Sequence, residues 1–452
     1  MRLLARFVLF VLITAALAWV THHAQAETTS ADCVEGYAGI YPCHNVNLLG
    51  HLSLTEMGAA EGVKGNDLWG WTDPDTGKKY VIFGFSDSTS FIDVTDPANP
   101  LYLGNLPGHD GPSQWRDMQV YQNYAFITAD IPTQSGIQVF DLTRLRDVAN
   151  PPVTFTADAH YDGFGAGHNL WANQETGYLY AFRSDTCSAA IHMINIQDSL
   201  NPTFVGCAAT DDAPLSDSEC LLYNGPDAAY TGRELCFTGS DDNMSIDDVT
   251  DKDNPVAVAR FGYPQIGRAH QGALTPDQRY WLMSDMNDEH HMGFNTRTHA
   301  FDITDLDAPI YLGYYEHATT AMDHNLYIVG NLVYEANFTA GLRILDISSL
   351  PGTDFTEVGY FDVMPDTDSI AMSGAWSNYP YWDEFVAVSD TENGLFLLQY
   401  VPDEPTSVGL SQFAGNAGSL WGGAFALWGG AFALLGALAL ATLAWRKKQA
   451  TN

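Results

Sequence analysis

The stretch that decides the fold runs from Asp323 to Asp346 and reads DHNLYIVGNLVYEANFTAGLRILD. Apolar residues alternate along its first half, the pair Gly330-Asn331 interrupts them, and Gly341 precedes a second apolar run. Period-2 alternation around a Gly-Asn pair, filled with β-branched and aromatic residues, indicates a β-hairpin followed by a further strand. The same pattern occurs, in whole or in part, seven times along the chain.

The second halves of these repeats are the easiest to align. Six of them carry an Asp or Asn at the end of an apolar run, and the seventh lacks it. They lie at residues 91–97, 139–142, 193–196, 246–251, 300–305, 344–347 and 395–400. A spacing of about 50 residues is typical of propeller blades and is too long for most solenoids. Several copies continue into an Asn-Pro or Ala-Pro turn and another short strand, so each repeat offers about four strands, which is one blade.

The sequence therefore predicts an all-β fold, a β-propeller that has seven blades, over residues 61–400. No long amphipathic helical pattern lies between residues 30 and 400, as expected of an all-β body. Closure of the ring hides the sheet edges. Two packed all-β domains are the alternative, but the equal spacing without a linker-like break argues against them.

The N-terminus carries an export signal. Residues 1–26 combine two arginines, a short apolar run and an A-x-A cleavage site, which is typical of a secretory signal peptide. A retained anchor is the alternative, although the apolar run is short for a membrane span. Residues 27–60 form a cysteine-containing N-terminal segment that precedes the first blade.

The C-terminus carries a membrane signal. A Pro-, Ser- and Gly-containing spacer at residues 401–419 leads into an apolar run at residues 420–445, which is long enough to cross a bilayer as a helix. Its many Gly and Ala residues also suit a sorting tail that is processed. The basic tail at residues 446–452 predicts a cytoplasmic end. We therefore expect an exported body at the cell surface, held by a C-terminal transmembrane or sorting segment.

The charge of the exported body limits its partners. All 55 acidic residues lie between positions 27 and 404, whereas five of the 19 basic residues lie outside that span. Nucleic acid and anionic lipid are poor partners for such a surface, and cations are good ones. Solubility at high salt is the alternative explanation of the charge.

Six cysteines in an exported chain predict disulfides, and six allow 15 pairings. Proximity in the sequence favours Cys33–Cys43, Cys187–Cys207 and Cys220–Cys236. A thiol enzyme is not expected, and the chain has no G-x-S-x-G elbow, no H-E-x-x-H motif and no phosphate-cradling glycine loop.

The repeats resemble LVIVD-type repeats, and the body as a whole resembles the choice-of-anchor B proteins over roughly residues 33–400. The segments that carry the resemblance are residues 33–43, 66–70, 115–117, 187, 191–193, 225–227, 233–236, 269–272, 296–298, 323–326, 340–343 and 374–380. The resemblance implies a secreted, surface-held propeller and no established reaction. Family members usually carry a His-Asp pair where this chain has Ser216-Asp217.

A polar residue recurs where the first strand of each blade opens onto the channel. These residues are Asp67, Asp117, His168, His270 and His324, with Asp217 and Trp376 at the equivalent places of blades 4 and 7. Imidazoles and carboxylates that converge in a channel mouth could bind a transition metal, position a water or hold a ligand. The alternative, which we favour, is that these side chains bond neighbouring blades and satisfy strand ends.

Residues 285–291 form a second polar cluster, in the fifth repeat. Asp285, Asp288 and Glu289 offer the hard oxygen ligands that suit calcium, and His290 could add a nitrogen ligand for a softer metal. A solvated acidic loop is the preferred alternative. Acidic residues at 241–243 and 247–248 raise the same question more weakly.

The many Trp and Tyr residues could stack on sugars, but we expect them to fill the space between sheets. Two functions remain open. The first is a membrane-anchored propeller that binds a surface protein or small ligand and does not bind nucleic acid. The second is a metal-dependent hydrolase or lactonase-like enzyme that uses the channel ring, with a divalent metal, calcium or a transition metal, as cofactor.

Overall fold

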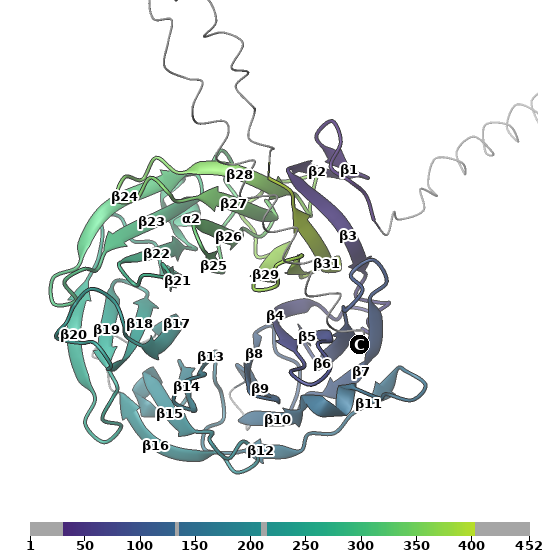
Figure 1. The fold of residues 1–452 in the computed structure, drawn as a ribbon, viewed down its shortest axis with the longest axis horizontal. Coiled ribbons are helices and arrows are strands. Elements are labelled where there is room, and N and C mark those ends of the chain that lie inside the picture. The colour runs from purple at the N-terminus through teal and green to yellow at the C-terminus, as the bar shows by residue number, and fades with distance from the viewer. Residues whose placement is uncertain (1–29, 132–134, 209–214, 403–452) are drawn as a thin grey trace, which may run out of the picture. The chain divides into compact units, whose positions relative to one another are not determined.

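The computed structural model describes residues 30–131, 135–208 and 215–402, which form a ring of seven β-sheets (Figure 1). Each sheet is a blade built on four antiparallel strands, and the blades are numbered here along the chain from the sheet that contains β4. The predicted all-β, seven-bladed propeller is therefore confirmed. The innermost strands of neighbouring blades contact one another all the way around, so the ring is closed.

The strands occupy four concentric positions. The innermost are β4 (Gly65–Thr72), β8 (Arg116–Tyr121), β13 (Asn169–Asn173), β17 (Leu215–Leu222), β21 (Ala269–Leu274), β25 (Leu326–Val329) and β29 (Ala375–Tyr379). The second are β5 (Lys79–Phe85), β9 (Tyr124–Ala129), β14 (Tyr178–Phe182), β18 (Glu234–Ser240), β22 (Tyr280–Asp285), β26 (Leu332–Ala336) and β30 (Val386–Asp390). The third are β6 (Ser88–Asp93), β10 (Ile137–Asp141), β15 (Ile191–Asn195), β19 (Met244–Asp248), β23 (Arg297–Asp302), β27 (Leu342–Asp346) and β31 (Gly394–Tyr400). The outermost are β7 (Leu101–Pro107), β12 (Ala159–Tyr161), β16 (Thr203–Ala208), β20 (Val256–Phe261), β24 (Ile310–Glu316), β28 (Thr356–Phe361) and β3 (Val46–Leu52).

A few short elements complete the described chain. Strand β11 (Val153–Thr154) runs parallel to β7 at the outer edge of blade 1. Strands β1 (Tyr37–Ala38) and β2 (Tyr41–His44) extend the outer edge of blade 6. Two 3-10 turns, η1 (Leu142–Leu145) and η2 (Cys187–Ala189), and one short helix, α2 (Asp288–Met292), lie in connections between strands.

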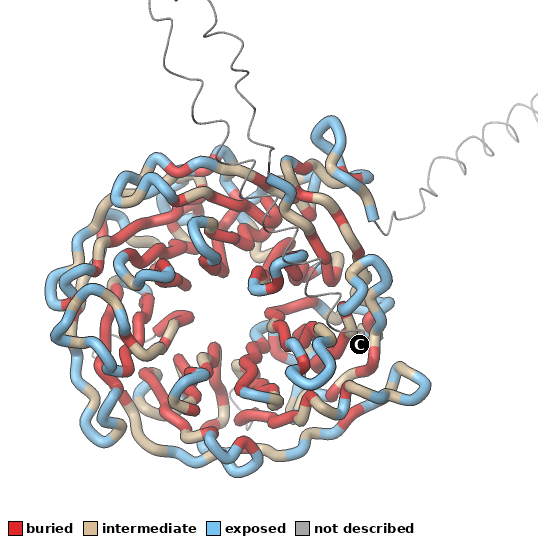
Figure 2. Tube along the Cα trace, in the orientation of Figure 1, coloured by how far each residue is buried: buried red, intermediate tan, exposed pale blue. Residues whose placement is uncertain are grey.

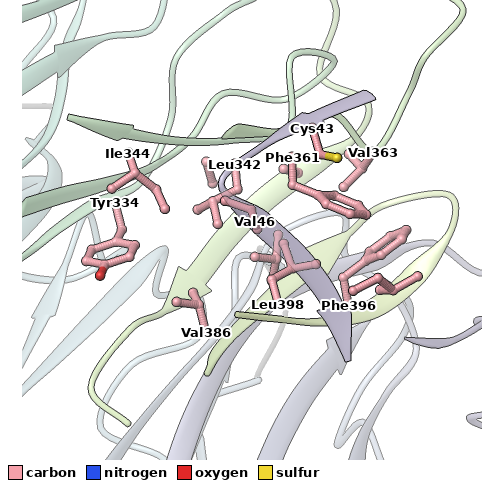
Figure 3. Packing of buried hydrophobic residues seen from close by; sticks show 14 of the residues in the cluster. Cys43, Val46, Tyr334, Leu342, Ile344, Phe361, Val363, Val386, Phe396 and Leu398 are labelled. Atoms are coloured by element: carbon pink, nitrogen blue, oxygen red, sulfur yellow. The ribbon is translucent and has the colours of Figure 1, made fainter. Parts of the chain in front are cut away.

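The ring closes through the N-terminal segment. Strand β3 pairs antiparallel with β31, so the outermost strand of blade 7 comes from the start of the chain and its other three strands from the end. Figure 3 shows the core beneath this closure, where Val46 and Cys43 pack with Phe361, Phe396 and Leu398. The propeller thus begins well before residue 61, because part of the segment that we assigned to residues 27–60 completes two blades.

The recurring Asp or Asn of the repeats has a structural reason. It ends the third strand, and its side chain accepts a hydrogen bond from the backbone N–H two residues later, which is an Asx turn. This bond is present at Asp93, Asp141, Asn195, Asp248, Asp302 and Asp346. The turn directs the chain toward the outermost strand. The seventh copy lacks the Asp, and the outermost place of its blade is filled by β3.

Apolar side chains between adjacent blades form the core. In Figure 2 the buried residues lie along the inner strands, whereas most exposed residues lie in the connections and at the outer edge. Between blades 1 and 2, for example, Phe91 stacks on Phe140 with ring centroids 4.4 Å apart, and Phe155 packs edge-on against both rings. Burial of such residues is the main stabilising contribution to the ring.

All three predicted disulfides are present. Cys33–Cys43 closes the N-terminal loop, Cys187–Cys207 joins η2 to β16, and Cys220–Cys236 bridges a directly opposed pair on β17 and β18. The described residues contain no free cysteine. Three disulfides agree with an exported protein.

The predicted signal peptide at residues 1–26 and the apolar run at residues 420–445 lie outside the described residues. Within the part of the chain that the structure describes, no helix is both long enough and apolar enough to cross a membrane.

Candidate functional site

The polar residues that recur in the repeats gather at one end of the channel, which we call the mouth. Asp67, Asp117 and His270 lie near the start of β4, β8 and β21; His168 immediately precedes β13, and His324 lies two residues before the start of β25. Because each innermost strand runs inward from the same end, residues that are far apart in the sequence become neighbours here. The predicted juxtaposition of these five residues is what the structure shows.

Two cavities open between these residues. The inner one has a volume of about 20 Å³ and is lined by Asp67, Asp117, Asp217, His168 and His324, among others. It has room for about one water molecule. The outer one, which we call the mouth cavity, has a volume of about 220 Å³ and is lined by Trp115, Asp130, His168, Arg183, Arg268, His270, Met286, Asn287, His324 and Met372.

Three charged residues of the mouth cavity were not predicted. Asp130 and Arg183 directly follow the second strands β9 and β14, and Arg268 directly precedes the innermost strand β21. Second strands run back toward the mouth, so the residue after each of them lies beside the channel. This position relative to the repeat was the available signal, and the sequence analysis considered only the openings of the first strands.

Two carboxylates of the inner cavity, Asp67 and Asp117, bond other blades, whereas Asp217 leaves one buried oxygen without a partner. Asp117 in blade 2 accepts a hydrogen bond from the backbone N–H of Leu170 in blade 3. Asp67 accepts from its neighbour Leu68 at 2.7 Å and from the side chain of Asn325 in blade 6 at 3.2 Å. For these two residues the structure thus agrees with the preferred alternative, in which polar side chains bond blade to blade.

Burial also sets the charge of the inner cavity. It raises the pKa of Asp67 to about 7, and it raises the pKa of Asp217 above its ordinary value. Burial, reinforced by the charges of Asp67 and Asp217, raises the pKa of Asp117 well above its ordinary value. Removal of a carboxylate from water penalises its ionised form, and close carboxylates penalise one another.

The histidines have free ring nitrogens in the cavities. His168 donates through Nδ1 to Asp130 at 3.0 Å, and its Nε2 lies 4.0 Å from an oxygen of Asp217. His324 donates through Nδ1 to the backbone oxygen of Trp376 at 2.6 Å. The rings of His270 and His324 lie 4.4 Å apart, and the buried Nδ1 of His270 has no hydrogen-bond partner. Two of the three imidazoles are therefore oriented through Nδ1, which leaves Nε2 for a ligand.

Two of these histidines, His270 and His324, are held in the neutral form. Burial lowers the pKa of His324 to about 3, and burial with the neighbouring His324 lowers the pKa of His270 well below its ordinary value. Burial also lowers the pKa of Arg268, with nearby Arg183 as a further cause. The mouth cavity thus combines two guanidinium groups with neutral imidazoles.

An aromatic cluster closes the channel beneath the mouth. Trp69, two residues beyond Asp67 on β4, lies 6.2 Å from Trp171 of blade 3, 5.8 Å from Tyr327 of blade 6, and 5.3 Å and 6.2 Å from Tyr379 and Tyr381. Only side chains that project into the channel can bring blades 1, 3 and 6 together. Three of these aromatics, Trp69, Trp171 and Tyr379, also pack against the apolar cores between blades, as expected. Trp71 fills such a space as well, where it stacks on Tyr80.

The second predicted cluster is buried, so the expected solvated loop is wrong. Asp288 and Glu289 form the first turn of α2, and Asp285 ends β22; their exposed fractions are 0%, 1% and 0%. His290 and His291, on the same short helix, are exposed. His299 takes the place that His290 was predicted to fill, because ligand atoms of Asp285, Asp288 and His299 lie within 4.8 Å of one another. We call Asp285, Asp288, Glu289, His299 and Asp323 the blade-5 cluster.

Unusual electrostatics accompany this burial. Burial, followed by the charge of Asp288, raises the pKa of Glu289 to about 9. Burial, followed by the charge of Glu289, raises the pKa of Asp323 well above its ordinary value. The weaker candidates in blade 4 are different, since Asp247 and Asp248 pair with Arg260 and Arg233.

The comparisons with known proteins identify the fold and no family. No family model and no curated protein matches the chain. Among solved structures, the hydrazine synthase of Kuenenia stuttgartiensis is similar with a TM-score of 0.50 and 11% identity, over 74% of this chain and 95% of that chain. A periplasmic gluconolactonase of Pseudomonas aeruginosa is similar with a TM-score of 0.44 and 11% identity, over 65% and 87%. The computationally designed protein Ika8 gives 0.47 and 11%, over 83% and 97%. At these identities the likeness shows the propeller fold alone.

Proposed function

We propose that the chain is an exported β-propeller of the choice-of-anchor B type, held at the cell surface, which binds a small anionic ligand in the mouth cavity. The resemblance in sequence supports the family and the anchoring. The disulfides support export. The mouth cavity supports the binding role and carries the proposal.

The decisive observation is the pair of arginines in the mouth cavity. The chain carries a net charge of −36, yet Arg183 and Arg268 line one cavity. Arg268 is held by single contacts, from Nε to Ser216 at 3.1 Å and to Asp241 at 3.4 Å, and it has no bidentate carboxylate partner among the described residues. Guanidinium groups with donors to spare and reduced hydration suit a carboxylate or a similar anion. The unpartnered nitrogen of His270 and the nearby Trp115 supply further contacts in a concave site.

Calorimetry on the purified full chain tests this proposal. Citrate and gluconate serve as anionic probes, and sorbitol serves as an uncharged probe of similar size. We expect the anions alone to bind, and Arg183→Gln or Arg268→Gln to weaken binding at least tenfold. Arg233→Gln is the matched control, because that arginine pairs with Asp248 away from the mouth cavity and its side chain is 52% exposed. Equal binding of the three probes, or an equal effect of all three variants, would contradict the proposal.

A metal-dependent hydrolase is the second candidate, and one observation favours it. His168, His270 and His324 line the same cavity, and His168 is oriented by Asp130 in the manner of a metal ligand with a supporting carboxylate. A bound zinc or manganese ion would activate a water in such a site. In the described residues, however, the mouth ligand atoms do not come within 4.8 Å of one another as a group of three. Stoichiometric transition metal that is lost in His270→Ala and His324→Ala, together with hydrolysis of a lactone, would establish this alternative.

A further inference from the structure

We propose that the blade-5 cluster is a buried site for a hard divalent cation of the calcium, magnesium or manganese class. The site lies behind the mouth cavity and is independent of the ligand proposed there. Ligand atoms of Asp285, Asp288 and His299 lie within 4.8 Å of one another, and the adjacent carboxylates of Glu289 and Asp323, which have unpartnered oxygens, would complete the site.

The first argument is the number of buried polar atoms without a partner. Oδ1 of Asp288, Oδ1 of Asp323 and both carboxylate oxygens of Glu289 make no hydrogen bond, although these residues are at most 3% exposed. Backbone N–H groups of Glu289 itself and of Asp323 lie near the Glu289 carboxylate without completing a bond of good geometry. Nε2 of the fully buried His299 is also unpartnered, while its Nδ1 lies 3.0 Å from the hydroxyl of Tyr311. Native proteins leave few buried polar atoms unpaired, and a cluster of them calls for a bound group.

The second argument is charge. Four carboxyl groups, from Asp285, Asp288, Glu289 and Asp323, meet a single arginine. Arg297 donates through Nε to Asp288 at 2.6 Å and is only 2% exposed. Buried charges require a partner, and one arginine leaves three carboxylates uncompensated. A dication supplies most of the missing positive charge.

The third argument is that one carboxylate already has a complete set of partners. Asp285 accepts hydrogen bonds from the hydroxyl of Tyr263 at 2.9 Å and from the backbone N–H groups of Gly267 and Arg268 at 2.7 and 2.5 Å. It holds the connection before β21 against α2. A Cβ on Gly267 would lie 2.4 Å from the backbone nitrogen of Asp288, so a larger residue there would push the helix away. Asp285 is therefore fixed in position, and the segment before β21 is packed closely against the start of α2.

The ligand set indicates the class of cation. Carboxylate oxygens outnumber the single imidazole, and oxygen ligands suit calcium, magnesium and manganese. His290, the nitrogen ligand that the sequence suggested, lies on the exposed side of α2 and takes no part. The Asp323-His324 pair links the two regions, because Asp323 belongs to the cluster and His324 lines the mouth cavity.

Metal analysis and thermal unfolding of the purified full chain test the proposal. We expect one equivalent of a divalent cation in the protein as isolated. After chelation, Tm should fall, and re-addition of the cognate ion at a hundredfold excess over its Kd should raise it by about 5 °C. Calcium, magnesium, manganese and zinc are added separately, so that the order of their effects identifies the class. Sodium at equal ionic strength controls for screening of the acidic surface.

A pair of variants separates this site from general effects of charge. Glu289→Gln with Asp323→Asn should abolish the bound equivalent and the rise in Tm. Asp241→Asn with Asp242→Asn, which removes the same charge from an exposed loop of blade 4, should change neither. If the first variant does not fold, the ion-dependent Tm of the chelated wild-type protein still decides. Absence of stoichiometric metal together with a Tm that no ion changes would overturn the proposal, and would mean that the carboxyl groups share protons instead. Anion binding at the mouth is measured separately, so the failure of one proposal leaves the other testable.

Discussion

The mouth of the channel and the blade-5 cluster both place carboxyl groups in the protein interior, and the adjacent residues Asp323 and His324 link the two regions in the chain. At the mouth, Asp117 accepts a hydrogen bond from Leu170 in the next blade and Asp67 accepts from Leu68 and Asn325, while Asp217 leaves one oxygen without a partner. In the blade-5 cluster, Glu289 and Asp323 leave oxygens without partners. The hydrogen bonds of Asp67 and Asp117 at the mouth join one blade to another, and a polar cavity lies beside them. The unpartnered oxygens of the blade-5 cluster are accounted for only if a further group, such as a cation, is bound there.

The comparison shows that burial alone does not identify a functional carboxylate. Asp67 and Asp323 are both buried, and burial raises the pKa of both. They differ in what surrounds them. Asp67 accepts hydrogen bonds through both oxygens, from Leu68 and Asn325, whereas Asp323 accepts one from the backbone N–H of Asp285 and leaves its other oxygen without a partner. The number of hydrogen-bond partners of each carboxylate oxygen thus distinguishes a structural carboxylate from a candidate metal ligand, and each prediction below tests this distinction.

The largest effect is expected from Arg297→Leu, measured by urea unfolding in the presence of chelator. Arg297 is the charge partner of Asp288, with nitrogens at 2.6 and 2.5 Å from one oxygen. Its removal leaves a buried carboxylate uncompensated, which costs about 3 to 5 kcal/mol of unfolding free energy. The cognate divalent cation should restore part of the loss, because it supplies positive charge at the same place.

Arg146→Leu provides the control for this prediction. Arg146 also pairs with a buried carboxylate, Asp73, but it lies on the outside of blade 1 and its side chain is 26% exposed. The loss of unfolding free energy in Arg146→Leu should be smaller than in Arg297→Leu, and a divalent cation should not restore it. Equal losses in both variants, or no rescue of Arg297→Leu, would show that the blade-5 cluster is an ordinary ion pair.

A smaller effect, with a characteristic pH dependence, is expected from Asp67→Asn. Burial raises the pKa of Asp67 to about 7, so the folded protein holds a proton there that the unfolded chain releases near pH 4. Between these values the folded state binds more protons, and stability due to this group falls as pH rises. The variant should lack that slope, gaining on the order of 2 kcal/mol relative to the wild type between pH 5 and pH 7. Urea unfolding at several pH values measures it. Parallel curves for both proteins would mean that Asp67 is ionised and compensated in the fold.

The fold was predictable because its signals are local and repeated. The Asx turn after the third strand requires an Asp or Asn at a fixed offset, and six copies of it, within seven repeats of alternating apolar residues, make the pattern visible. The ring of Asp67, Asp117, His168, His270 and His324 was predictable for the same reason. Closure by β3 was not, because its partner β31 lies at the other end of the described chain and an outer strand has no distinctive residue of its own.

The burial of the acidic run was not predictable either. In the sequence, Asp285, Asp288 and Glu289 read as a polar surface loop, because such charge is usually solvated. Their burial depends on Tyr263, Arg297 and Asp323, which come from other segments and whose approach is a property of the packed blade. His290 was chosen as a ligand for its nearness in sequence, whereas His299 is near in space.

The smallest effect is therefore expected from the residues that the sequence would have chosen. In a variant that combines His290→Ala and His291→Ala, unfolding free energy should change by less than about 0.5 kcal/mol, because both side chains are exposed at the end of α2. Cation content, measured by metal analysis, should remain at one equivalent. His299→Gln is the matched change at the buried position, and it should weaken cation binding because Nε2 faces Asp288 at 3.8 Å. If the cation is lost in the first variant and kept in His299→Gln, the cation binds on the exposed side of α2. The unpartnered carboxylates of blade 5 would then hold protons rather than metal.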